Sequence, residues 1–179
     1  KKLDELHADD AIRKNAGAVE ALSSPQGSRP DPSTYLSKEY IAEHLSKFTN
    51  EGAGSRIVLK KAYDKYGIGK PDVGKTEFIS LKSDIDKLIL ESNGDVKKIA
   101  HSLGIDESQL AGGSLVRVDF KFASKYKPYM PSGNEYGINE KWMPGGKLPD
   151  GDLEVIVKTE GMVKDVDYVV VDLLTGKTL

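Results

Sequence analysis

The stretch Val116-Arg117-Val118-Asp119-Phe120-Lys121-Phe122 alternates apolar and charged side chains without a break. Successive side chains of a β-strand point to opposite faces, so this alternation predicts a strand over residues 114–122 with one buried and one charged face. Two further β-prone runs follow at residues 153–159 and 167–174. A turn around Glu160-Gly161 predicts that these two runs pair as a terminal hairpin.

Helical patterns dominate the residues before this strand. Ser37 is placed to cap a helix over residues 38–48, because apolar side chains follow it at helical spacing. Ser83 and Asp95 are likewise placed to cap the two members of a helical pair that ends at Gly104. These elements cluster by type along the chain, which favours helices packed on a sheet.

Two weaker β-prone runs, Ile57-Val58-Leu59 and Phe78-Ile79-Ser80-Leu81, lie between these helices, and residues 63–74 between the runs predict an exposed loop. The sequence therefore predicts an α+β fold. In this fold, N-terminal helices and a helical pair pack on a mainly antiparallel β-sheet with a long functional loop.

The first 22 residues carry a weak apolar stripe at near-helical intervals, which predicts one or two amphipathic helices. Pro and Gly then recur over residues 23–32 and break any helix, so we expect a linker there. The predicted division is a helical linker segment over residues 1–30 and a main domain over residues 31–179.

Composition excludes several classes of site. The formal net charge of −2 and the pI near 6.0 provide no overall attraction to polyanions, so a nucleic-acid site would need a local basic patch. The chain has no Cys, and its three His are far apart, which predicts no metal site. His44 lies on the apolar stripe of its helix and is interpreted as a core-edge residue. No phosphate-binding or dinucleotide fingerprint predicts a cofactor, and no apolar run approaches the about 18 residues of a membrane span.

Residues 128–151 separate two strand patterns and are rich in Gly and Pro. Loops of this length are uncommon inside compact domains, and they are usually either functional or disordered. The aromatic residues Tyr129, Tyr136 and Trp142 argue against disorder, because disordered segments are depleted in large apolar groups. We therefore expect the functional site in this loop.

The loop and its flanks combine cations with aromatic rings, which can hold phosphates while stacking on exposed bases. The same composition also fits an ordinary solvated surface. The residues that this pattern indicates for substrate binding are Lys127, Tyr129, Trp142 and Lys147.

Metal-independent RNA cleavage needs a base, an acid and a cation near the phosphate. Glu135 or Glu154 could act as the base, and Arg117 or Lys147 could stabilise the phosphate. Ser132 and Asn134 would then orient the substrate. The alternative for either glutamate is an ordinary solvent-facing position.

Four segments carry a resemblance to a known family: Tyr35-Leu36-Ser37-Lys38-Glu39-Tyr40-Ile41, Met130-Pro131-Ser132-Gly133-Asn134-Glu135, Trp142-Met143-Pro144-Gly145-Gly146-Lys147 and Gly151-Asp152-Leu153-Glu154. With them the chain resembles C-terminal toxin domains of bacterial polymorphic toxins, which belong to contact-dependent growth inhibition and Rhs-like systems. The resemblance covers roughly residues 33–157.

The resemblance implies a secreted or surface-delivered toxin that acts in the cytoplasm of a target bacterium and is neutralised by a cognate immunity protein. Residues 1–30 would be the end of a segment for import into that cell. Many such toxins are transfer-RNA nucleases, and some require elongation factor Tu. Others modify protein or RNA with NAD.

Three functions follow as hypotheses. The first is a metal-independent ribonuclease toxin that cleaves tRNA. The alternative is an NAD-consuming toxin, an ADP-ribosyltransferase or NAD glycohydrolase, in which Glu154 stabilises the ribose cation and Arg56 or Arg117 holds the pyrophosphate. The third is a non-catalytic module whose aromatic loop binds a protein partner.

Overall fold

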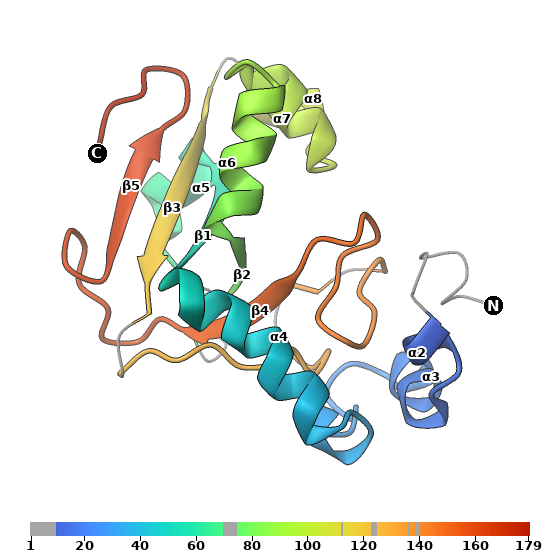
Figure 1. Cartoon of the computed structure of the whole chain (residues 1–179). Helices are drawn as coiled ribbons and strands as arrows, with labels where there is room; N and C mark the ends of the chain where they lie inside the picture. The colour runs from blue at the N-terminus through green and yellow to red at the C-terminus, as the bar shows by residue number, and fades with distance from the viewer. Residues whose placement is uncertain (1–9, 70–74, 112, 123–124, 136, 139) are drawn as a thin grey trace.

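A computed structural model of the chain describes residues 10–69, 75–111, 113–122, 125–135, 137–138 and 140–179 (Figure 1). Its centre is a five-stranded sheet in the order β4-β2-β1-β3-β5. Its neighbouring strands run antiparallel, which confirms the α+β class with a mainly antiparallel sheet. The strands are β1 (Ala53–Leu59), β2 (Thr76–Leu81), β3 (Leu115–Lys121), β4 (Glu154–Lys158) and β5 (Tyr168–Asp172).

The helical elements are α2 (Asp10–Arg13), α3 (Ala16–Ser23), the 3-10 turn η1 (Pro32–Thr34), α4 (Lys38–Glu51), α5 (Lys60–Tyr66), α6 (Lys82–Glu91), α7 (Val96–Ser102) and α8 (Glu107–Leu110). Ser37 caps α4 and Asp95 caps α7 through their side-chain oxygens, as the sequence predicts. None of the described helices is long and apolar enough to cross a membrane.

The two faces of the sheet pack against different helices. Val116, Val118 and Phe120 of β3 are buried in one apolar cluster with Phe48 of α4. Ile57 and Leu115 point to the opposite face, where they join side chains of α6, α7 and α8 in a second cluster. The alternation from Val116 to Phe120 therefore serves the first face, and Leu115 at the start of β3 serves the opposite one.

Strands β1 and β2 separate after a short ladder. Their register consists of two pairs, Gly54 with Leu81 and Ser55 with Ser80. Beyond this point, Arg56 donates from Nη1 to the carbonyl of Phe78 at 3.1 Å instead of continuing a regular ladder. The sheet is thus split between β1 and β2, and residues of both strands line a cavity there.

The predicted terminal hairpin is wrong. β4 pairs with β2 and β5 pairs with β3, so the two strands lie at opposite edges of the sheet (Figure 1). The stretch between them crosses below the sheet, and Asp167 accepts a backbone hydrogen bond from Lys121 on the way. Closeness in sequence favours pairing only when the connection is a tight turn, and this connection is much longer.

Two local predictions are also wrong. Residues 63–66, predicted as loop, belong to α5, where Lys60 and Asp64 form an i,i+4 ion pair of 2.7 Å. The rest of that prediction falls partly on residues 70–74, which lie outside the described residues. Ser83 does not cap α6, because the helix already begins at Lys82 and the Ser83 hydroxyl donates to Glu51.

The described part of the N-terminal segment forms α2 and α3, in agreement with the predicted helices; residues 1–9 lie outside the description. Ile12 and Ala18 share an apolar cluster with Leu36, Met130 and Met143. The division between residues 1–30 and 31–179 stays a prediction, but the two parts pack together through this cluster.

Phe48 offers a test of the packing. Its ring is fully buried, so Phe48→Ala should lower the free energy of unfolding by about 3–5 kcal/mol through lost contacts and a cavity. Leu90→Ala, at a side chain 77% exposed, should change it by less than about 0.5 kcal/mol. Chemical denaturation followed by circular dichroism measures both, and equal effects would contradict this core.

Candidate active site

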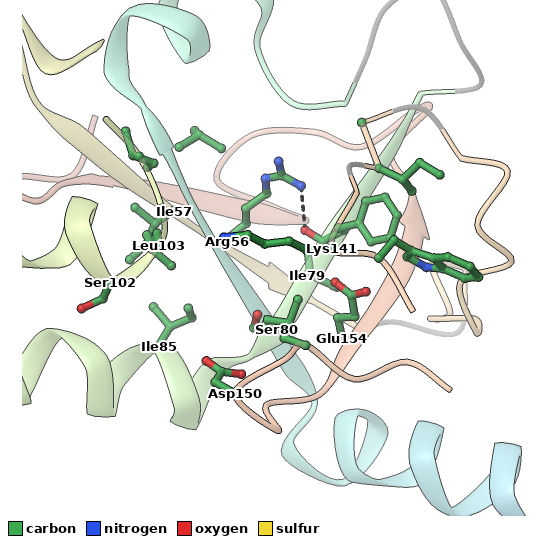
Figure 2. Close-up of a pocket in the computed structure, with 18 of the residues that line it drawn as sticks. Arg56, Ile57, Ile79, Ser80, Ile85, Ser102, Leu103, Lys141, Asp150 and Glu154 are labelled. Carbon is green, nitrogen blue, oxygen red and sulfur yellow. Dashed lines mark hydrogen bonds between the residues drawn. The ribbon is translucent and has the colours of Figure 1, made fainter. Parts of the chain in front are cut away.

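A cavity of about 740 Å³ lies where the sheet splits (Figure 2). Its walls come from β1, β2 and β4, from the α6–α8 side of the sheet, and from residues 137–138, 141–142 and 148–150 of the long loop. Most lining side chains are apolar. The polar and aromatic side chains of the lining include Arg56, Ser80, Lys141, Trp142, Asp150 and Glu154.

Glu154 is the first residue of β4 and lies opposite Ser80 of β2. It is only 8% exposed, and within the described residues no hydrogen bond reaches its carboxylate. Burial raises the pKa of Glu154 to about 7; Arg56 opposes this rise, and the charges of Glu135 and Asp150 add to it. The side chain can therefore take up or release a proton near neutral pH.

The backbone of Glu154 is held from two sides. Its N–H donates to the carbonyl of Gly146 at 2.8 Å, and its own carbonyl accepts from His44 Nε2 at 2.8 Å. Burial lowers the pKa of His44, so the ring is neutral at pH 7 and carries its hydrogen on Nε2. One turn earlier in α4, Tyr40 donates to the carbonyl of Gly145 at 2.7 Å.

Gly146 shows why this contact is close. Its φ of +70° is a left-handed conformation, and a Cβ there would lie 2.5 Å from His44 Nε2. The Pro-Gly-Gly element thus lets the loop pass directly over α4. The loop reaches Glu154 only because no side chain intervenes.

Glu135, Ser132 and Asn134, predicted as catalytic, lie outside the cavity lining and build the loop. The Glu135 carboxylate accepts from the backbone N–H of Ser132 and Gly133, both at 3.0 Å, and from the Ser132 hydroxyl at 2.5 Å. Asn134 forms hydrogen bonds with the backbone of residues 27 and 29. These side chains are used in holding the turn, although the charge of Glu135 still raises the pKa of Glu154.

Arg117 is also engaged elsewhere. Its Nη1 pairs with Asp86 at 2.8 Å and its Nε with Asp119 at 2.9 Å, and only 12% of the side chain is exposed. It lies on β3 and does not line the cavity. The proposed phosphate contact would require this ion-pair network to open.

The predicted binding residues divide in the same way. Trp142 lines the cavity, whereas Tyr129, Lys127 and Lys147 do not. Tyr129 exchanges two backbone hydrogen bonds of 2.9 Å with Ile156 on the outer edge of β4, and Lys127 is exposed. Lys147 lies opposite Leu153 in an isolated bridge.

Three residues that line the cavity were not among the site residues predicted from the sequence: Ser80, Lys141 and Asp150. Arg56 entered only with the NAD hypothesis. Arg56 forms an ion pair with Glu77 at 3.0 Å. Its place beside the apolar run 57–59 is the one feature of the sequence that marks it. Ser80 had no comparable signal, because only the β2–β4 register brings it beside Glu154.

Further acidic side chains interact electrostatically with Asp150, which lines the cavity. Partial desolvation, together with the charges of Asp150 and Asp84, raises the pKa of Asp152 to about 6, although part of the residue stays exposed to solvent. Burial also raises the pKa of Asp84, with Glu51 and Asp150 adding to the effect. Within the described residues, no group of three potential ligands has the geometry of a metal site.

Glu154→Gln tests the buried charge. Folding raises the pKa of this carboxyl from 4.5 to about 7, because the folded state favours its neutral form. The free energy of unfolding of the wild type therefore falls as pH rises through this window. The variant should therefore gain about 2–3 kcal/mol relative to the wild type between pH 5 and pH 8. Denaturation at both pH values measures this. Glu160→Gln, at an exposed position, is the control, and a pH-independent difference for Glu154→Gln would contradict the burial.

Comparisons with known proteins identify no family for this chain. No protein-family model matches the chain, and searches of curated proteins and of solved structures find no significant match. The resemblance to polymorphic toxins stays a prediction from the sequence, and a function has to be argued from the cavity.

Proposed function

We propose that this domain is an NAD-consuming toxin that binds the dinucleotide in the cavity and uses Glu154 to break the bond between nicotinamide and ribose. The observation that carries the proposal is the buried carboxylate of Glu154 in a largely apolar cavity, where no hydrogen bond reaches it from the described residues and Arg56 is close enough to act on its pKa. Its place in competition between bacteria rests on the resemblance of the sequence.

The size and lining of the cavity support a small-molecule ligand. Ligand sites are typically concave, mostly apolar and about 300–1,000 Å³ in volume, with a few polar groups that fix orientation. The cavity of about 740 Å³ fits this description. A site for an RNA backbone would instead be expected to show a basic groove.

The chemistry needs one negative charge at a defined place. When the glycosidic bond breaks, the electron pair leaves with the ring nitrogen of nicotinamide and neutralises it, while positive charge develops on the ribose. An ionised Glu154 beside that ribose would stabilise this charge electrostatically. Water or a nucleophile of a target molecule then bonds to the ribose carbon and loses a proton.

Two cations that line the cavity with Glu154 could bind the pyrophosphate. Arg56 lies on β1 at the split of the sheet, and Lys141 approaches from the long loop (Figure 2). Trp142 and the apolar side chains of the wall would contact an aromatic base. In this arrangement, cation and carboxylate recognise different parts of one ligand.

A second candidate function is a metal-independent ribonuclease that cleaves tRNA. A carboxyl with a pKa of about 7 is well placed to act as base and then acid near neutral pH. Glu154 would accept the proton of the ribose 2′-hydroxyl, and Arg56 or Lys141 would face the phosphate. The exposed Lys127, with Tyr129 and Lys147, would then contact RNA outside the cavity.

The biological setting is part of the proposal. The domain would be secreted or delivered from the cell surface, act in the cytoplasm of the target bacterium and be neutralised by a cognate immunity protein. Elongation factor Tu would be a partner only in the tRNA-nuclease case. These points rest on the resemblance to polymorphic toxins.

Nicotinamide release from NAD and the integrity of total RNA, measured with the same purified protein, separate the two candidates. Glu154→Gln should lower the turnover of the true substrate by at least about 100-fold, because an amide carries no charge. Glu160→Gln should stay at the wild-type rate. Undiminished turnover in Glu154→Gln would remove the proposed chemistry, and RNA cleavage without NAD loss would select the ribonuclease.

The pH profile tests the role of Arg56. The rate of the wild type should rise with pH through about 7, as Glu154 becomes ionised. Arg56→Gln removes a cation that lowers the pKa of Glu154, so the rising limb should move to higher pH. The double variant Arg56→Gln/Glu77→Gln controls for the partner carboxylate that the single change leaves unpaired. An unmoved limb in both variants would contradict the coupling.

A further inference from the structure

We infer that Arg29 is a positioning residue for the cavity: it clamps Trp142, so that residues 26–29, ahead of the predicted main domain, hold one wall of the ligand site in place. The inference rests on the proposed function for its ligand, a nucleotide. The clamp itself can be tested without any substrate.

Arg29 joins three parts of the molecule. Its guanidinium carbon lies 4.6 Å from the centroid of the Trp142 ring, a cation–π contact. Its Nη1 donates to the carbonyl of Gly133 at 2.7 Å, and its Nε donates to the carbonyls of Ala21 and Ser24 at 3.0 Å each. One side chain therefore ties the end of α3 to the long loop and to the indole ring.

The neighbouring contacts fix Arg29 in place. The Asn134 side-chain oxygen accepts from the backbone N–H of Gly27 at 2.8 Å and of Arg29 at 3.0 Å, and its amide donates to the Arg29 carbonyl at 2.9 Å. Gln26 donates to the carbonyl of Glu135 at 2.9 Å. Residues 26–29 and residues 134–135, more than a hundred positions apart in sequence, are thus joined by several hydrogen bonds.

Gly133 leaves no spare room for the ring. A Cβ at this position would lie 2.6 Å from Trp142 and 2.7 Å from the Arg29 side chain, and the φ of +88° also favours glycine. Trp142 is only 6% exposed and lines the cavity. The ring is held between the N-terminal segment and the loop, and its position sets part of the cavity wall.

The clamp gives the Ser132-Gly133-Asn134-Glu135 turn a physical role. Glu135 closes the turn and Asn134 binds residues 27 and 29, while Gly133 admits both the ring and Arg29. The turn is shaped to receive the N-terminal segment. Loss of Arg29 should therefore weaken ligand binding while leaving the chemistry of Glu154 in place.

Trp142 is the only tryptophan of the chain, so its fluorescence reports this contact directly. The experiment compares the wild type, Arg29→Met and Arg29→Lys, with Lys65→Met as a matched control. Lys65 also lies over an aromatic ring, that of Tyr66 at 5.1 Å, but it is exposed on α5. Circular dichroism confirms that each protein is folded.

Arg29→Met should increase quenching of Trp142 by acrylamide and raise the KM for NAD about tenfold, with kcat changed by less than about threefold. Arg29→Lys should fall between it and the wild type, because lysine keeps the charge but lacks the planar fork. Lys65→Met should match the wild type in both readouts.

Unchanged quenching in Arg29→Met would overturn the clamp. Increased quenching with an unchanged KM would show that the clamp exists but does not serve the site, which also overturns the inference. A wild type that releases no nicotinamide from NAD would instead overturn the proposed function, while the quenching comparison still decides the Arg29 contact.

Discussion

A carboxylate without a hydrogen-bond partner in the described structure is buried at the start of β4, where α4 and the long loop both bind the backbone of the same residue. Burying a charge is unfavourable unless it is paired, and proteins usually avoid it by pairing or by neutralising the group. Glu154 is neutralised in part by its raised pKa. A side chain of this kind lowers stability, which makes a functional role the natural explanation for its presence.

The fold supplies this position through a split in the sheet. Because the ladder between β1 and β2 stops after Ser55 and Ser80, the floor of the sheet opens beside Glu154 instead of closing over it. Arg56 enters the gap and moderates the electrostatics of the carboxylate. The helices α6–α8 cover one part of the same face, and the long loop covers the other.

The long loop behaves as a folded layer. Met130, Trp142 and Met143 are buried in it, and its turn is closed by Glu135. Its contacts run to α4 through Gly145 and Gly146 and to the N-terminal segment through Asn134. Side chains whose chemistry suggests catalysis, such as Glu135 and Asn134, can therefore serve to shape a loop through their hydrogen bonds.

The sequence by itself determined the elements with strong local signals. The alternation in β3, the Ser37 and Asp95 caps and the folded character of the long loop all depend on residues close in the chain. Only the tertiary structure decided which strands pair: it put β4 and β5 at opposite edges, placed Ser80 beside Glu154, and joined Arg29 to Trp142. Strand pairing, burial and the resulting pKa values depend on contacts between distant residues, and no local pattern encodes which distant residues will meet.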